Sequence, residues 1–156
     1  MTSTSDFEGF SRLQTPSDLL RKLEHDLSRM LEDPEDEYAA FDFFLTAEHM
    51  IDWVLPNKRD EQAALRASEA ILQVVSHVAN GAKHYRATAR HHQSVKSVER
   101  SGYVEPGYVE SGYFLEPVAI GLSASQAQHL GRKEIEAVEL GKLVVDYWRH
   151  RLGNVA

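Results

Sequence analysis

The amino-acid sequence predicts a mainly α-helical protein, an antiparallel four-helix bundle with a β-hairpin inserted between its third and fourth helices. Three observations support this prediction. Four stretches carry apolar residues at helical spacing. Residues 86–122 are instead rich in glycine, serine and β-branched residues, which favours strands and turns. At 156 residues, the chain is long enough for one domain with its own core.

The first two helices are delimited by residues with clear end preferences. Thr15 can cap a helix that begins at Pro16, because proline fits the first helical position, and Pro34 ends it. A second helix is expected over residues 37–55, before Pro56. Both stretches have a broad apolar face, so both are expected to pack in the bundle.

The third and fourth helices are predicted from apolar spacing alone. One long helix is expected over residues 59–85, with a polar stripe opposite its apolar side. The last helix is expected within residues 124–152, most reliably from Lys133 onward, and Gly153 would terminate it.

These elements give a simple division of the chain. Residues 1–14 show no clear period and are expected to form an N-terminal tail. Residues 15–156 are expected to form a single helical domain, in which residues 87–122 are the hairpin insertion.

The insertion contains a short tandem repeat, GYVEP-GYVES-GYFLEP, at residues 102–117, called here the Tyr-Gly repeat. A period of five keeps its tyrosines on neither a strand face nor a helix face, so an exposed loop or hairpin tip is expected. Tyrosine is favoured at interfaces, and we expect the repeat to pack on a second copy or another protein. The alternative is a hairpin folded back on its own bundle. The partner-binding candidates are Tyr103, Tyr108 and Tyr113.

Composition excludes several classes of protein. The hydrophobic fraction of 42% and the charged fraction of 26% are typical of soluble globular proteins. No run is apolar enough to span a bilayer, and the N-terminus lacks a signal peptide, so a cytoplasmic protein without membrane association is expected. Cysteine is absent, which excludes disulfides, thiolate metal ligands and thiol nucleophiles.

Charge is unevenly distributed along the chain. The net charge is −7, yet residues 83–100 contain five basic residues against the single carboxylate of Glu99. A basic patch of this kind is typical of nucleic-acid-binding proteins, even where the whole chain is acidic. The alternative is a solvated edge that balances acidic neighbours.

Within this basic segment, Arg86 is followed after four residues by His91. The pair resembles the Arg-x4-6-His motif of HEPN domains, helical bundles of bacterial toxins and defence systems, many of which cut RNA without metal as dimers. The resemblance implies that Arg86 holds the phosphate while His91 moves a proton as acid or base. The residues expected to bind phosphate or RNA beside them are Asn80, Lys83, His84, Arg90 and His92.

Two further stretches, NGAKH and the earlier AEHMIDW, are similar to uncharacterised bacterial and phage proteins of this size. This second resemblance implies no activity.

A separate polar cluster lies on the second expected helix. Glu48, His49 and Asp52 are spaced so that their side chains lie near one another. They could bind a divalent metal if His77 or His84 of the third helix joined them, because helical bundles hold such ligands on facing helices. The alternative is an ordinary polar or hydrogen-bonding face. No cofactor is expected.

Three functions therefore stay open. The leading hypothesis is a HEPN-like protein of a bacterial or phage defence or toxin system that binds RNA or cuts it without metal. The second is a non-enzymatic protein-binding factor, such as an inhibitor, immunity protein or defence accessory, that uses the Tyr-Gly repeat. The third is a helical bundle that binds a small molecule or a metal. The expected partners are RNA, a second copy of the chain or another protein.

Overall fold

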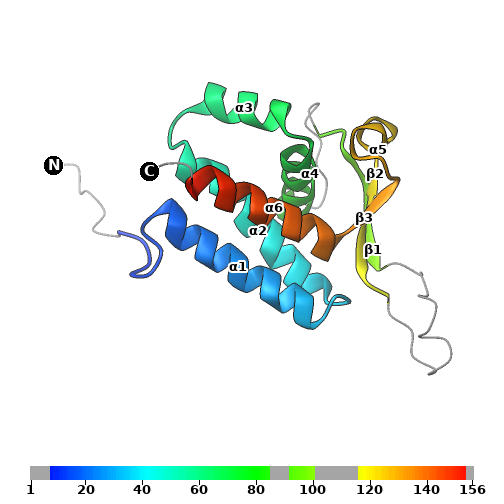
Figure 1. The fold of residues 1–156 in the computed structure, drawn as a ribbon, viewed down its shortest axis with the longest axis horizontal. Coiled ribbons are helices and arrows are strands. Elements are labelled where there is room, and N and C mark those ends of the chain that lie inside the picture. Colours follow the sequence, from blue (N-terminus) through cyan, green and yellow to red (C-terminus); the bar gives the residue numbers. More distant parts are fainter. Residues whose placement is uncertain (1–7, 85–91, 101–115, 154–156) are drawn as a thin grey trace.

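The computed structural model describes residues 8–84, 92–100 and 116–153. In these ranges the protein is mainly helical, with 68% of the residues in six helices, and has a small antiparallel sheet of three strands (Figure 1). In chain order the elements are α1 (Pro16–Glu32), α2 (Glu37–Val54), α3 (Arg59–Ser68), α4 (Ala70–His84), β1 (Val95–Arg100), β2 (Val118–Leu122), α5 (Ala124–Leu130), β3 (Glu134–Glu136) and α6 (Ala137–Gly153).

Local capping fixes the starts of α1 and α2, and the cap of α1 is the one that the sequence predicts. The Thr15 hydroxyl accepts the Asp18 amide at 3.1 Å, and the Asp18 carboxylate accepts the Thr15 amide at 3.0 Å, with Pro16 at the first position. The Asp36 carboxylate accepts the amides of the second and third residues of α2, so it satisfies donors that have no partner within the helix.

The expected third helix is wrong in one respect, because two helices occupy its place. α3 ends at Ser68, Glu69 adopts an extended conformation, and α4 begins at Ala70. The amide side chain of Gln73 donates to the carbonyl of Ala67 at 2.9 Å, which satisfies an acceptor at the broken end. The sequence contains no proline or glycine at this point, so nothing local signals the break.

The expected fourth helix also divides. α5 ends at Leu130 and is capped by Gly131, which adopts a left-handed conformation with φ of 71°, and the chain then forms β3 before α6 begins. The three residues of β3 are too short a run to show an alternating pattern. α6 ends at Gly153, as predicted.

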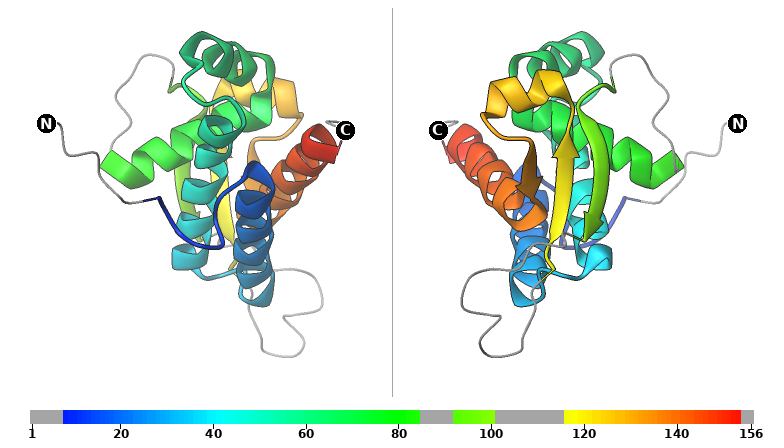
Figure 2. Two further views of the ribbon diagram at one scale, coloured as in Figure 1. Left: turned by 90° about the vertical axis from the view of Figure 1, so that its left-hand side faces the viewer. Right: turned by 90° about the vertical axis from the view of Figure 1, so that its right-hand side faces the viewer.

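The sheet lies on one side of the helices, with α4 next to β1 and α6 next to β2 and β3 (Figure 2). Its strand order is β1-β2-β3, and consecutive strands are antiparallel. β1 and β2 are consecutive antiparallel strands, while residues 101–115 between them lie outside the described residues.

The core lies where α1, α2, α4 and α6 meet the inner face of the sheet. Its largest fully buried side chains include Leu23, Met30, Phe43, Phe44, Met50, Ile120, Ile135, Leu140 and Trp148. None of the described helices combines the length and the apolar character that a membrane span requires.

Gly141 sets the closest approach of α6 to its neighbours. A β-carbon added there would lie 2.8 Å from the Met30 methyl carbon, 3.0 Å from a Leu27 methyl carbon and 3.4 Å from the Phe43 ring. Gly81 of α4 offers a contrast, because a β-carbon there meets no atom within 4 Å.

We predict that Gly141→Val lowers the free energy of unfolding by about 1–3 kcal/mol, the usual cost of overpacking a core. The matched variant Gly81→Val should leave it nearly unchanged, since valine is no worse a helix former than glycine. Urea denaturation measures both. Equal stabilities for the two variants would contradict the close packing at Gly141.

Candidate binding groove at the open edge of the sheet

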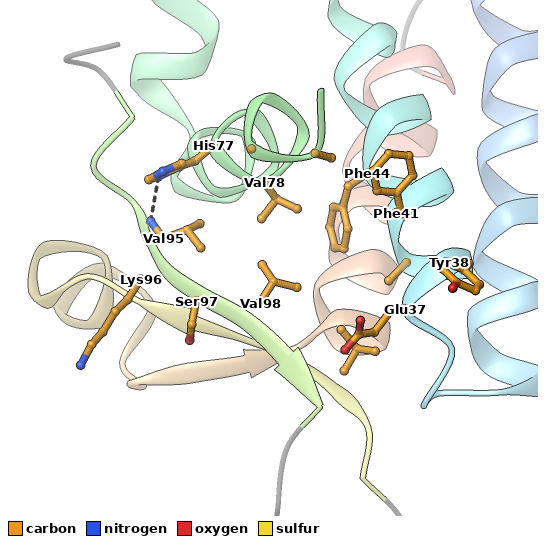
Figure 3. Close-up of a pocket in the computed structure, with 14 residues that line it drawn as sticks. Glu37, Tyr38, Phe41, Phe44, His77, Val78, Val95, Lys96, Ser97 and Val98 are labelled. Atoms are coloured by element: carbon orange, nitrogen blue, oxygen red, sulfur yellow. Dashed lines mark hydrogen bonds between the residues drawn. The ribbon is translucent and has the colours of Figure 1, made fainter. Parts of the chain in front are cut away.

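A groove with a volume of about 460 Å³ lies between α2, α4 and β1 (Figure 3). We call it the edge groove. Its wall is mostly apolar and is drawn from all three elements. The apolar and small residues that line it include Tyr38, Phe41 and Phe44 of α2, Val78, Gly81 and Ala82 of α4, and Val95 and Val98 of β1.

The edge groove collects exposed apolar side chains. Six large apolar side chains are exposed in the described part of the chain, and three of them line this groove. They are Tyr38 at 84% exposure, Phe41 at 45% and Val98 at 44%. Single exposed apolar residues are ordinary, but a contiguous group beside a cavity is typical of a binding surface.

The α2 wall arises because this helix is apolar on two sides. Phe43 and Phe44 point into the core and pack edge to face, with ring centroids 5.2 Å apart. Tyr38 and Phe41 are three residues apart and so share an outward face. Phe44 is buried and also lines the groove, so it forms part of its floor.

α4 contributes little side-chain volume to the groove, because two of its lining residues are small. Gly81 and Ala82 face the groove, and Gly81 has free space where a side chain would project. Val78, one turn earlier, points across the groove toward Val98 (Figure 3). The cavity therefore lies above small residues and between two valines.

His77 fixes the start of β1 against α4. Its Nδ1 atom accepts the backbone amide of Ser94 at 3.0 Å and that of Val95 at 2.9 Å, the second of which is drawn in Figure 3. A nitrogen that accepts carries no hydrogen, so the proton of the neutral ring is on Nε2. The ring of His92 lies near, with its centroid 5.4 Å from that of His77.

A buried amide holds the same end of β1 from the other side. The Gln126 side chain of α5 donates to the Ser94 hydroxyl at 3.0 Å and to the Gln73 side-chain oxygen at 2.6 Å. Ser94 and Gln126 are both buried. The first residues of β1 are therefore fixed by α4 and α5 together.

The outer edge of β1 presents backbone groups that pair with no described strand. The amides of Val118 and Leu122 donate away from β1, to Pro34 and Lys133, whereas the Ser123 amide donates to Ser94 on the β1 side. In a strand, the backbone groups of successive residues point to opposite sides. The backbone groups of Ala119 and Gly121 therefore point toward their β1 partners Glu99 and Ser97. The backbone groups of Val98 and Arg100 consequently point outward, where none of the described strands pairs with them.

The apolar inner face of the sheet extends to this edge. Val98, Ile120 and Ile135 lie in one row across the three strands. Ile120 is fully buried and Ile135 is 2% exposed, but Val98 at the end of the row is 44% exposed. The helices therefore cover two strands of the inner face and leave the third partly open.

Basic residues occur at or next to the groove-lining positions of α4 and β1. Lys83 and His84 end α4 just after Gly81 and Ala82, and both are exposed, as is Lys96 of β1. None of these three forms an ion pair with another described residue. Glu37 is an acid on the opposite wall.

Arg100, at the far end of β1, is already neutralised. Its guanidinium lies 3.4 Å from the Glu35 carboxylate and 3.2 Å from that of Glu116. The Glu116 amide also donates to Glu35 at 2.7 Å, which ties the start of β2 to the loop before α2.

The residues that the HEPN resemblance selects fall into two groups. Arg86, Arg90 and His91 lie outside the described residues. Of the described ones, Lys83 and His84 are exposed, and His92 lies beside His77. The Asn80 side chain donates to the carbonyl of Ser76 at 2.8 Å, within its own helix. Tyr103, Tyr108 and Tyr113 lie outside the described residues as well.

The cluster proposed as a metal site does not converge. The Glu48 carboxylate accepts from Arg66 of α3 at 2.7 Å, and burial raises the pKa of Glu48 even though Arg66 acts to lower it. His49 and Asp52 are exposed and 4.0 Å apart. No group of three or more possible metal ligands occurs among the described side chains.

Sequence reasoning missed the groove and the role of His77. One signal was present, because Tyr38 and Phe41 form a second apolar patch on a helix whose other face is already apolar. The contribution of Val98 has no comparable signal, since its exposure depends on which helices cover the sheet.

Comparisons with known proteins give no match. The chain matches no family model, no curated protein and no solved structure. These comparisons therefore neither support nor contradict the HEPN resemblance.

We predict that His77→Leu lowers the free energy of unfolding by about 1–2 kcal/mol, because it leaves two amides without an acceptor. His77→Asn should cost less, since its side-chain oxygen can accept near the position of Nδ1. Chemical denaturation and hydrogen exchange of the Val95 amide measure both effects. If the two variants exchange and unfold alike, the double hydrogen bond is not what anchors β1.

Proposed function

We propose that this protein is an interaction module that binds an extended polypeptide segment in the edge groove. The observation that carries the proposal is a coincidence of two features at one place. The outward backbone groups of Val98 and Arg100 lie beside a groove lined by exposed apolar side chains.

The two features serve different parts of one interaction. An extended segment added to a sheet edge gains affinity from backbone hydrogen bonds and specificity from pockets for alternate side chains. Val98 and Arg100 offer donors and acceptors for about three residues of such a segment. The space between Val78, Phe41 and Val98 can take an apolar side chain from its inward face.

This proposal corresponds to the non-enzymatic hypothesis drawn from the sequence. It requires no metal and no catalytic group, and it accounts for the exposure of Tyr38 and Phe41, which neither the RNA hypothesis nor the metal hypothesis uses.

Selection of random peptides on the full-length protein tests the proposal. We expect enriched peptides to lose affinity by about tenfold or more for Phe41→Asp, which places a charge in the apolar groove. Val98→Pro should have a similar effect, because it removes an outward amide without breaking a bond to β2. Fluorescence titration measures the binding.

Two matched variants control for general effects. Leu143→Asp changes an apolar residue of similar exposure on α6, and Val98→Thr keeps the outward amide. Leu143→Asp should bind as the unaltered protein does, Val98→Thr should bind more tightly than Val98→Pro, and thermal melting should show all four variants folded. Peptides that bind all variants equally would contradict a groove-specific function.

A second candidate function is RNA binding or metal-independent RNA cleavage, as the HEPN resemblance implies. The observation in its favour is the exposed pair Lys83 and His84 at the end of α4, directly before the segment that holds Arg86 and His91. An unpaired basic helix end can contact a phosphate backbone.

Under this second hypothesis, His91→Ala should reduce RNA cleavage by about 10²- to 10⁴-fold in the presence of a chelator. The melting temperature should stay the same. His49→Ala, which changes an exposed histidine of α2, is the control and should cleave normally. Absence of ribonuclease activity in the unaltered protein, over several RNAs, would remove the hypothesis.

A further inference from the structure

We propose that the edge groove of one molecule binds the Tyr-Gly repeat of a second copy, so that two chains form a dimer through exchanged segments. The inference rests on the proposed function and names the partner of that same groove. It combines the chemistry of the groove with the position and the sequence of the repeat.

The length of the repeat unit matches the length of the open edge. Only Val98 and Arg100 direct backbone groups outward at the described end of β1, which suits a strand of about three residues. The first two units each place three residues, Tyr-Val-Glu, between a glycine and a proline or serine. Glycine permits a turn before the short strand, and proline stops the ladder after it.

The apolar and acidic side chains of each repeat unit match the apolar lining of the groove and the basic residues near it. In an extended Tyr-Val-Glu unit, the tyrosine and the glutamate lie on one face and the valine on the other. An apolar member of each unit can therefore enter the groove beside Phe41 and Val98. The glutamates can approach Lys83 and Lys96, which form no ion pair within the described residues and outnumber Glu37.

The topology favours a second copy over the same molecule. The repeat leaves β1 at Arg100 and rejoins the described chain at Glu116, whose carboxylate is 3.2 Å from that arginine. A segment that folded back antiparallel on the outer edge of β1 would be parallel to β2. Parallel strands need a connection of a dozen or more residues. Of the fifteen residues 101–115, a turn and a three-residue strand would leave about ten for the connection to β2. A second molecule has no such restriction.

Cross-linking of single-cysteine variants tests the exchange, because the natural chain contains no cysteine. Full-length Tyr38→Cys and ¹⁵N-labelled Tyr108→Cys are mixed and treated with a short bismaleimide. We expect a product whose mass contains one chain of each kind. The control pair, Leu143→Cys with Tyr108→Cys, should give only background, since Leu143 is also exposed but lies on α6.

Sedimentation of the full-length protein supplies the second measurement. We expect a dimer that becomes a monomer in Val98→Pro and in the triple variant Tyr103→Ser, Tyr108→Ser, Tyr113→Ser, with helical circular dichroism retained in each. The triple variant lies outside the groove, so it tests the repeat even if Val98→Pro fails to fold.

Three results would overturn the exchange. The first is a natural protein that sediments as a monomer. The second is cross-linking only between two Tyr38→Cys chains, which would mean that the β1 edges of two molecules pair directly. The third is a link within one chain of the double variant Tyr38→Cys, Tyr108→Cys. If one of these is found while selected peptides still need Phe41 and Val98, the edge groove binds segments but the repeat is not its partner. If peptide binding is also groove-independent, both proposals fail.

Discussion

The small sheet depends on its attachment to the helices, and the rest of the site follows from that constraint. Strands of six, five and three residues are too short to be stable alone in water. Burial of Ile120 and Ile135 supplies the apolar contact, and the two hydrogen bonds accepted by His77 fix the edge strand against α4. Because β1 is held at its start, its later residues are placed beside α2, where Tyr38 and Phe41 are exposed. The groove is thus a consequence of how the sheet is docked.

The helices do not cover the whole inner face of the sheet, and apolar surface at β1 is therefore left exposed. α6 covers the inner face at β2 and β3, and α4 meets β1 only near its start. Small residues at Gly81 and Ala82 keep α4 from filling the remaining space. Val98 is therefore left 44% exposed, whereas Ile120 in the same row of the sheet is fully buried.

The sequence predicted those parts of the fold that local chemistry controls. Thr15, Pro16 and Asp36 determine helix starts through hydrogen bonds within a few residues, and α1 and α2 occur where expected. The break at Glu69 had no proline or glycine to signal it, and the strand at residues 134–136 depends on pairing with β2, as at Gly121. The groove is of the second kind, since it joins residues of α2, α4 and β1 that are far apart in the chain. Of the predicted site residues, Lys83 and His84 follow the groove residues Gly81 and Ala82 in α4, whereas the Glu48 carboxylate is paired with Arg66.

An exposed strand edge endangers a soluble protein, because it can pair with any other edge, and β1 carries features that restrict such pairing. The register shifts between Val95 and Ser97, so Lys96 is an extra residue that interrupts a regular ladder. Charged side chains at Lys96, Glu99 and Arg100 further disfavour a long apolar strand beside it. His77 already occupies the outward amide of Val95. What stays available is a short edge around Val98, next to an apolar groove. An edge shortened in this way selects a partner by length as well as by side chain, and a segment interrupted by glycine every five residues meets that length requirement better than a continuous strand would.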